Sequence, residues 1–196
     1  MTATAYREPL LWVTSTSSWE DEALIARLLP PAAVLPGDVA LAEVPVNPYL
    51  VVVARETQPS CEVLLRQFGM VTDTDGTTRQ NVADGWTIAA TILLATAPGK
   101  QEKEFRNYAA ALTDDPKRVV MRVPFMRSWR LSPIAELPRW DFTSTVQGRG
   151  RTRPRTDGLP AVLADGFSQI MSHVAHLRDQ DKARTDDTDT GTQQCA

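Results

Sequence analysis

The residues with the clearest capacity for chemistry are arginines in the second half of the chain. Seven of them occur between positions 127 and 155, namely Arg127, Arg130, Arg139, Arg149, Arg151, Arg153 and Arg155. A guanidinium group binds phosphate or carboxylate through two parallel hydrogen bonds. The interleaved Trp129 and Trp140 could stack on the bases of a single nucleic-acid strand. The pattern predicts a binding strip for nucleic acid or for an acidic protein surface, unless these residues form a plain solvated loop.

The overall charge weighs against nucleic acid among these alternatives. The chain has 196 residues and a formal net charge of −3, whereas proteins that coat nucleic acid are usually basic. It holds no run of about 18 apolar residues, which a membrane-spanning helix requires, and its first residues lack the layout of a signal peptide. Its two cysteines are too few for a disulfide framework. We therefore expect a cytoplasmic protein that makes no membrane contact.

The two histidines offer a second candidate for chemistry. His173 and His176 stand three positions apart, so on a helix they share one face, where they could clamp a metal ion or act in acid–base catalysis. No further group of His or Cys exists to complete a site, and solvated helix positions explain the pair better.

Two other motifs are weaker still. The run Asp73-Thr74-Asp75-Gly76 resembles part of a calcium loop, but Val71 and Ala83 stand where oxygen ligands would be needed, so a surface turn is favoured. Cys61 has no neighbouring base and fits a structural cysteine. We expect no catalytic residue, no metal and no cofactor.

The elements that must position these residues are clearest in the middle of the chain. Residues 86–96 alternate as a strand does, and residues 101–112 place apolar side chains on one helical face. Elsewhere the patterns predict a helix at 19–29 and strands at 38–44, 49–54, 119–125 and 140–147, with a short strand at 10–14 and either a helix or a strand at 60–68. Residues 159–177 carry the strongest amphipathic pattern.

These elements predict an α+β fold with a mostly antiparallel sheet packed by two or three helices. We expect a single domain over residues 1–178, including a basic loop at 148–158 and a helix at 159–178. Residues 179–196 are polar, without apolar anchors, and predict a tail that is disordered or ordered only by a partner.

The order of these elements resembles that of tail-terminator and tail-completion (head–tail connector) proteins of tailed bacteriophages. Three pieces carry the resemblance: Asn47-Pro48-Tyr49-Leu50-Val51-Val52-Val53 after an opening helix, the strand at 86–96, and the helix at 101–112 that follows it. The resemblance covers residues 19–147. It implies an antiparallel sheet packed by helices, and it carries no functional residue over to this chain.

The resemblance also implies a function. The chain would be a non-enzymatic structural protein of a virion or phage-tail-like particle, assembled in the host cytoplasm. It would form a homo-oligomeric ring, by resemblance a hexamer, that ends the tail tube or joins tail to head, with tail-tube and head-proximal proteins as partners. The alternative is a nucleic-acid-binding accessory protein that uses the strip Arg127–Arg155.

Overall fold

The computed structural model describes residues 9–35, 47–72, 78–80, 85–113, 119–140 and 159–192. Its centre is a five-stranded sheet in the order β2-β1-β3-β6-β7, and every neighbouring pair is parallel. The strands are β1 (Leu11–Ser15), β2 (Ala32–Val34), β3 (Tyr49–Arg55), β6 (Thr87–Leu94) and β7 (Val119–Val123). The expectation of a mostly antiparallel sheet is therefore wrong.

The parallel direction follows from the helices that connect the strands. Helix α1 (Trp19–Leu28) joins β1 to β2, α2 (Gln58–Phe68) lies between β3 and β6, and α3 (Lys103–Thr113) joins β6 to β7. After a strand ends, a helix carries the chain back to the end of the sheet at which that strand began. The next strand therefore runs in the same direction. Strand β3, in the segment expected as a strand at 49–54, pairs with β1 and β6.

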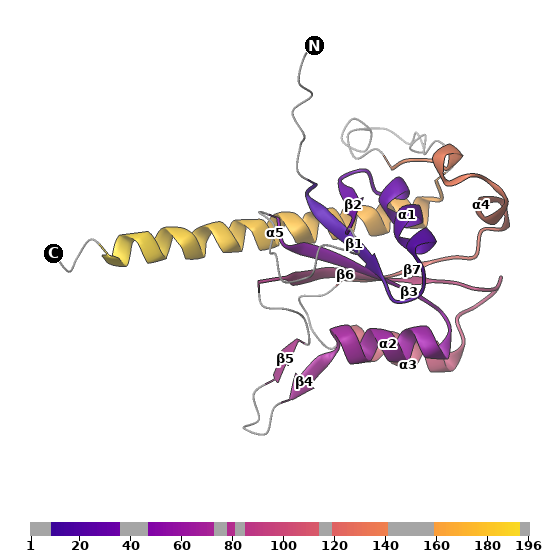
Figure 1. Ribbon diagram of the computed structural model, residues 1–196, viewed down its shortest axis with the longest axis horizontal. Helices are drawn as coiled ribbons and strands as arrows, with labels where there is room; N and C mark the ends of the chain where they lie inside the picture. Colours follow the sequence, from indigo (N-terminus) through magenta and orange to yellow (C-terminus); the bar gives the residue numbers. More distant parts are fainter. Residues whose placement is uncertain are drawn as a thin grey trace, which may run out of the picture.

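The helices cover both faces of the sheet. Figure 1 shows α1 and α5 (Ala161–Thr192) on one face, with α2 and α3 on the other. The chain moves from β1 toward one edge and from β3 toward the opposite edge. Right-handed crossovers then require α1 to lie on the face opposite α2 and α3. The fold is a three-layer, doubly wound arrangement.

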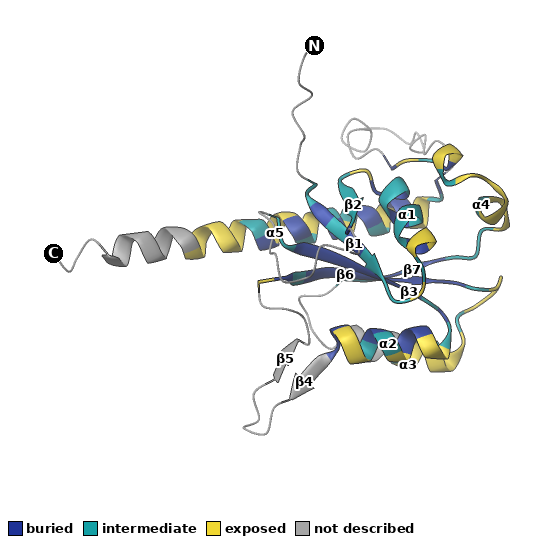
Figure 2. Ribbon diagram, viewed as in Figure 1, coloured by how far each residue is buried: buried dark blue, intermediate teal, exposed yellow. Residues whose placement is uncertain are grey.

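Two apolar cores fill the space between these layers. The larger lies between the sheet and α1 and α5, and includes Leu28, Val53, Ile92 and Phe167. The smaller lies on the face covered by α2, and includes Leu64. Strands β3 and β6 contribute to both cores, and Figure 2 shows them buried along their length. Their nearly unbroken apolar sequences are typical of strands covered on both faces.

Helix α5 extends farther than the sequence predicts. Its first half packs on the sheet through Leu163, Phe167, Ile170 and Val174. The helix then continues to Thr192, through a segment that we expected to lack structure of its own. Once a helix is nucleated, each further residue adds one backbone hydrogen bond, so extension needs no apolar face. Residues 193–196 lie outside the described residues.

The remaining elements are short. Strands β4 (Met70–Thr72) and β5 (Thr78–Gln80) form an antiparallel hairpin, while α4 (Arg127–Leu131) and a single 3-10 turn, η1 (Ile134–Glu136), follow β7. The predicted strand at 38–44, and that at 140–147 beyond its first residue, fall outside the described residues. Within the part of the chain that the structure describes, no helix has the length and apolar character needed to cross a membrane.

Candidate functional site

The topology indicates where a site belongs. Open α/β sheets bind ligands outside the carboxyl ends of their strands, near the point where the strand order reverses. Numbered along the chain, the five sheet strands have the order 2-1-3-4-5, which is one of the two common doubly wound orders. The reversal lies between β1 and β3, so a ligand site is expected at the turns after these two strands.

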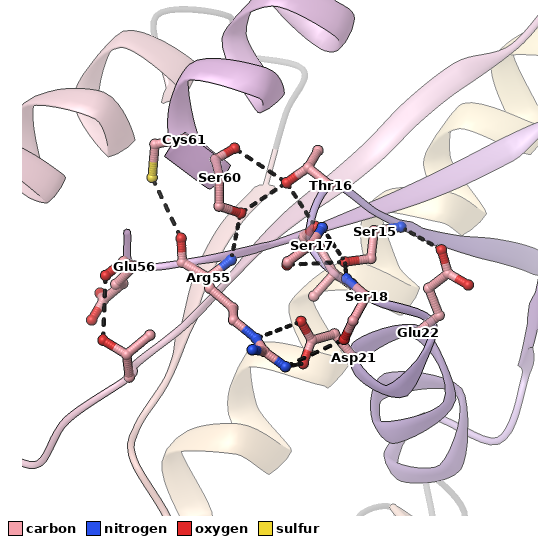
Figure 3. A network of polar contacts seen from close by, with 12 residues as sticks. Ser15, Thr16, Ser17, Ser18, Asp21, Glu22, Arg55, Glu56, Ser60 and Cys61 are labelled. Atoms are coloured by element: carbon pink, nitrogen blue, oxygen red, sulfur yellow. Dashed lines mark hydrogen bonds and ion pairs between the residues drawn. The ribbon is translucent and has the colours of Figure 1, made fainter. Parts of the chain in front are cut away.

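Side chains of the protein close this reversal point. The hydroxyl groups of Thr16 and Ser60 lie 2.9 Å apart, and Thr16 Oγ1 also lies 3.2 Å from the carbonyl oxygen of Ser60. The backbone N–H of Arg55 donates to Ser60 Oγ at 3.0 Å. Figure 3 shows these bonds joining the turn after β1 to the start of α2. Side chains of the protein itself therefore occupy the crevice between the two turns.

An ion pair continues the network on the face covered by α1. Arg55 binds Asp21 through two hydrogen bonds, Nε to Oδ2 at 2.8 Å and Nη2 to Oδ1 at 3.1 Å. Asp21 is buried. Hydrogen bonding to this carboxylate raises the pKa of Arg55 above its ordinary value. The pair fixes the first turn of α1 to the end of β3.

The first turn of α1 is unsuited to a phosphate ligand. Helix N-termini attract anions through their free N–H groups and their dipole. Here the turn already holds three carboxylates, those of Glu20, Asp21 and Glu22. Glu22 accepts the backbone N–H of Ser15 at 2.8 Å, and burial is the main cause that raises its pKa. A phosphate group at this position would meet like charges.

A second ion pair lies on the opposite face of the sheet. Glu56 is buried and accepts two hydrogen bonds from Arg122 of β7, at 2.6 and 2.8 Å. Gln101 donates to the same carboxylate at 2.8 Å. These contacts fasten β3, β7 and the connection before α3 to one another, which is a structural role.

A pocket of about 430 Å³ opens beside the Arg55–Asp21 pair. Its floor is formed by the ends of β6 and β7, one wall by the first turns of α1, and the other by α4 and η1. The lining residues are Trp19, Glu20, Asp21, Leu24, Arg55, Leu94, Ala95, Val123, Pro124, Met126, Trp129, Arg130, Ser132, Pro133, Ile134 and Leu137. The volume is typical of sites for small organic molecules, and the lining combines apolar residues with a smaller number of polar and charged ones.

Two indole rings stand at this pocket. Trp19 is the first residue of α1, and 70% of its surface is exposed. Trp129 on α4 is partly buried. Aromatic side chains left in contact with water beside a cavity often mark a binding surface.

The structure places only part of the predicted arginine strip. Arg127 and Arg130 lie on α4, and Arg139 is exposed in the segment after η1. The other four arginines fall outside the described residues. Arg130 lines the pocket, with its guanidinium carbon 5.0 Å from the centre of the Phe125 ring. Trp140 is buried, edge-on to Phe167, and is therefore not available for stacking on a nucleic-acid base.

The other candidates lie away from the pocket. His173 and His176 are on α5, where His176 Nε2 lies 2.9 Å from the side-chain nitrogen of Gln180. Cys61 is fully buried, and its burial raises the pKa of its thiol. Residues 73–76 fall outside the described residues. Within the ranges that the structure describes, no three His, Cys, Asp or Glu side chains gather as metal ligands would.

The sequence reasoning missed the pocket itself. The pattern at 19–29 predicts a helix and no site, and the wall opposite this helix comes from a segment more than a hundred residues later. Five successive hydroxyl residues, from Thr14 to Ser18, separate a short strand from a helix, but this turn lies at the closed reversal point and contributes no residue to the pocket lining.

Comparisons with protein-family models, with curated proteins and with solved structures gave no match. The function is therefore argued from the fold and the pocket.

Proposed function

We propose that this chain is a small-molecule-binding protein and that its site is the pocket between α1 and the α4–η1 segment. The observation that carries the proposal is the position of the pocket, at the carboxyl ends of β3, β6 and β7 in a doubly wound sheet. Its volume of about 430 Å³ suits an organic molecule of drug size.

The lining favours a flat, mainly apolar ligand. The floor presents aliphatic side chains, among them Leu94 and Val123. Trp19 of α1 and Trp129 of α4 contribute aromatic rings to the lining. Aromatic groups that stack on such faces gain about 0.5–1.5 kcal/mol beyond the burial of their surface. The acidic first turn of α1 disfavours a phosphate group.

The five tryptophans of the chain give a direct test by NMR. Each indole N–H gives its own resonance, and the variants Trp19→Phe and Trp129→Phe identify the two that line the pocket. A library of aromatic fragments should contain members that shift these two resonances in a saturable way. Trp12 and Trp86 belong to the smaller core on the other face of the sheet, so their resonances should stay in place.

Two variants check that the shifts report on the pocket. Trp129→Ala should abolish saturable binding, whereas Val162→Ala, at an exposed position of α5 outside the pocket lining, should leave it unchanged. The proposal is wrong if no fragment shifts the Trp19 and Trp129 resonances, or if Trp12 and Trp86 respond equally.

The ring-forming role in a phage particle, its partners and the non-enzymatic character of the chain stay predictions. Their support is element order, and the sheet direction implied by the resemblance differs from the parallel sheet observed. Light scattering on the purified protein tests the ring. The nucleic-acid alternative rests on the strip Arg127–Arg155, and it predicts DNA or RNA binding that weakens steeply with salt.

A further inference from the structure

We propose that the ligand of this pocket is a zwitterion, with an ammonium group and a carboxylate on an aromatic or aliphatic body, as in an aromatic amino acid. This inference rests on the proposed function and adds the charge of the ligand to it. The two walls of the pocket carry opposite charges, and the floor between them is apolar.

The wall formed by α1 is acidic. Two of the three carboxylates in its first turn are engaged, Asp21 by Arg55 and Glu22 by the backbone N–H of Ser15. Glu20 lines the pocket and is exposed. Among the contacts of the described residues, it is the carboxylate of this turn left to receive an ammonium group. Trp19, the residue before Glu20, also lines the pocket, and an indole ring is the aromatic group that attracts a cation most strongly.

The wall formed by α4 and η1 contributes one charged side chain to the lining, that of Arg130 on α4. The carboxylate of this segment, Glu136 of η1, lies outside the lining. The guanidinium group of Arg130 stands over the ring of Phe125, at 5.0 Å from the centroid. A cation–π contact uses the charge of the group and leaves N–H donors for a bidentate bond to carboxylate.

The pocket as a whole is close to electrically balanced. Asp21 binds Arg55, and Glu20 adds a smaller electrostatic attraction to the same guanidinium group. Among the contacts of the described residues, Glu20 and Arg130 are the charges of the lining without a hydrogen-bonded partner. A ligand with a single charge would pair with Glu20 or with Arg130 and leave the other facing its apolar body. A zwitterion pairs with both residues, and its apolar body lies over the aliphatic floor and the indole rings.

Four probes with the same ring separate these contributions. L-Tryptophan carries both charges at pH 7, tryptamine only the ammonium group, indole-3-propionate only the carboxylate, and indole neither. Titrations followed at the Trp19 and Trp129 resonances should rank tryptophan as the tightest and indole as the weakest. Glu20 and Arg130 are both solvent-exposed. We therefore expect each charge on the ligand to lower the dissociation constant about two- to five-fold.

Two charge-removing variants assign each contribution to a residue. Glu20→Gln should weaken tryptophan and tryptamine but not indole-3-propionate. Arg130→Gln should weaken tryptophan and indole-3-propionate but not tryptamine. Matched controls are Arg127→Gln, on α4 but outside the lining, and Glu104→Gln, on α3 at the other face; neither should change any dissociation constant.

Equal affinities for the four probes, or charge variants that act on all of them alike, would overturn the zwitterion. Indole binding at the two resonances would in that case leave the proposed pocket intact. If none of the four probes binds, the zwitterion is also overturned, and the fragment library decides separately whether the pocket binds anything.

Discussion

Arg55 and Glu56 are neighbours at the end of β3, and their side chains bind partners on opposite faces of the sheet. Arg55 pairs with Asp21 of α1, and Glu56 pairs with Arg122 of β7. Successive side chains of a strand alternate between faces, so two adjacent charges can serve two layers. Together they fix the carboxyl edge beside which the pocket opens.

The ion pair of Glu56 with Arg122 is the more deeply buried of the two, so removing Glu56 should lower the free energy of unfolding. Glu56→Ala leaves Arg122, which is only partly exposed, without its carboxylate and Gln101 without its acceptor. We expect a loss of about 2–4 kcal/mol in the free energy of unfolding, measured by urea denaturation. The control Glu20→Ala removes an exposed carboxylate from the first turn of α1 and should cost about 0.3–1 kcal/mol at most. Similar midpoints for the two variants would contradict this account.

At the scale of elements, a polar contact joins α5 to the start of β3. The hydroxyl group of Tyr49 donates to Asp181 Oδ2 at 2.7 Å. Burial is the main cause that raises the pKa of Tyr49, and the hydrogen bond to Asp181 adds to it. The neutral phenol is therefore the form that the folded protein favours.

This raised pKa predicts a loss of stability at alkaline pH. The contribution of Tyr49 is complete below the ordinary tyrosine pKa of about 10, and it is lost as the pH rises from there toward the higher pKa of the folded state. The unfolding free energy of the unaltered protein should thus fall more steeply above pH 10 than that of Tyr49→Phe. Parallel curves for the two proteins would show that the phenol does not titrate differently on folding.

Much of the element pattern was predictable, but the direction of the sheet was not. Strands near β1, β3, β6 and β7, and helices near α1 and α3, follow from apolar periodicity, and the structure confirms them within a few residues. Periodicity reports which side chains are buried and is silent about which neighbour a strand pairs with. The three residues of β2 are too few for a periodic signal, and α2 matched helix and strand alike.

The candidate site was harder to predict for a related reason. Its walls combine Trp19 and Arg130, which only the tertiary fold brings to one cavity. Arg130 was singled out as one of a basic strip, whereas the pocket sets it opposite an acidic helix turn.

For the whole molecule, the sheet links the two cores into one folding unit. Because β3 and β6 contribute side chains to both cores, loss of either core exposes the same strands. We expect two-state unfolding, with circular dichroism and tryptophan fluorescence giving coincident transitions.

Variants in the two cores test this coupling. Phe167→Ala in the larger core and Leu64→Ala in the smaller should each cost about 2–5 kcal/mol and shift both signals together. Val162→Ala, beside the larger core but 61% exposed, is the control and should shift neither. Separate transitions for the two signals would mean that the faces unfold independently.

The length of α5 has a practical consequence for assays. Asp181 meets the start of β3, at the edge opposite the pocket, and the helix continues away from the sheet to Thr192 (Figure 1). At about 1.5 Å per residue, its end stands about 20 Å beyond Leu177, the last buried side chain of the helix among the described residues. Attachment to a sensor chip through this end should leave the pocket open to analytes in the flow.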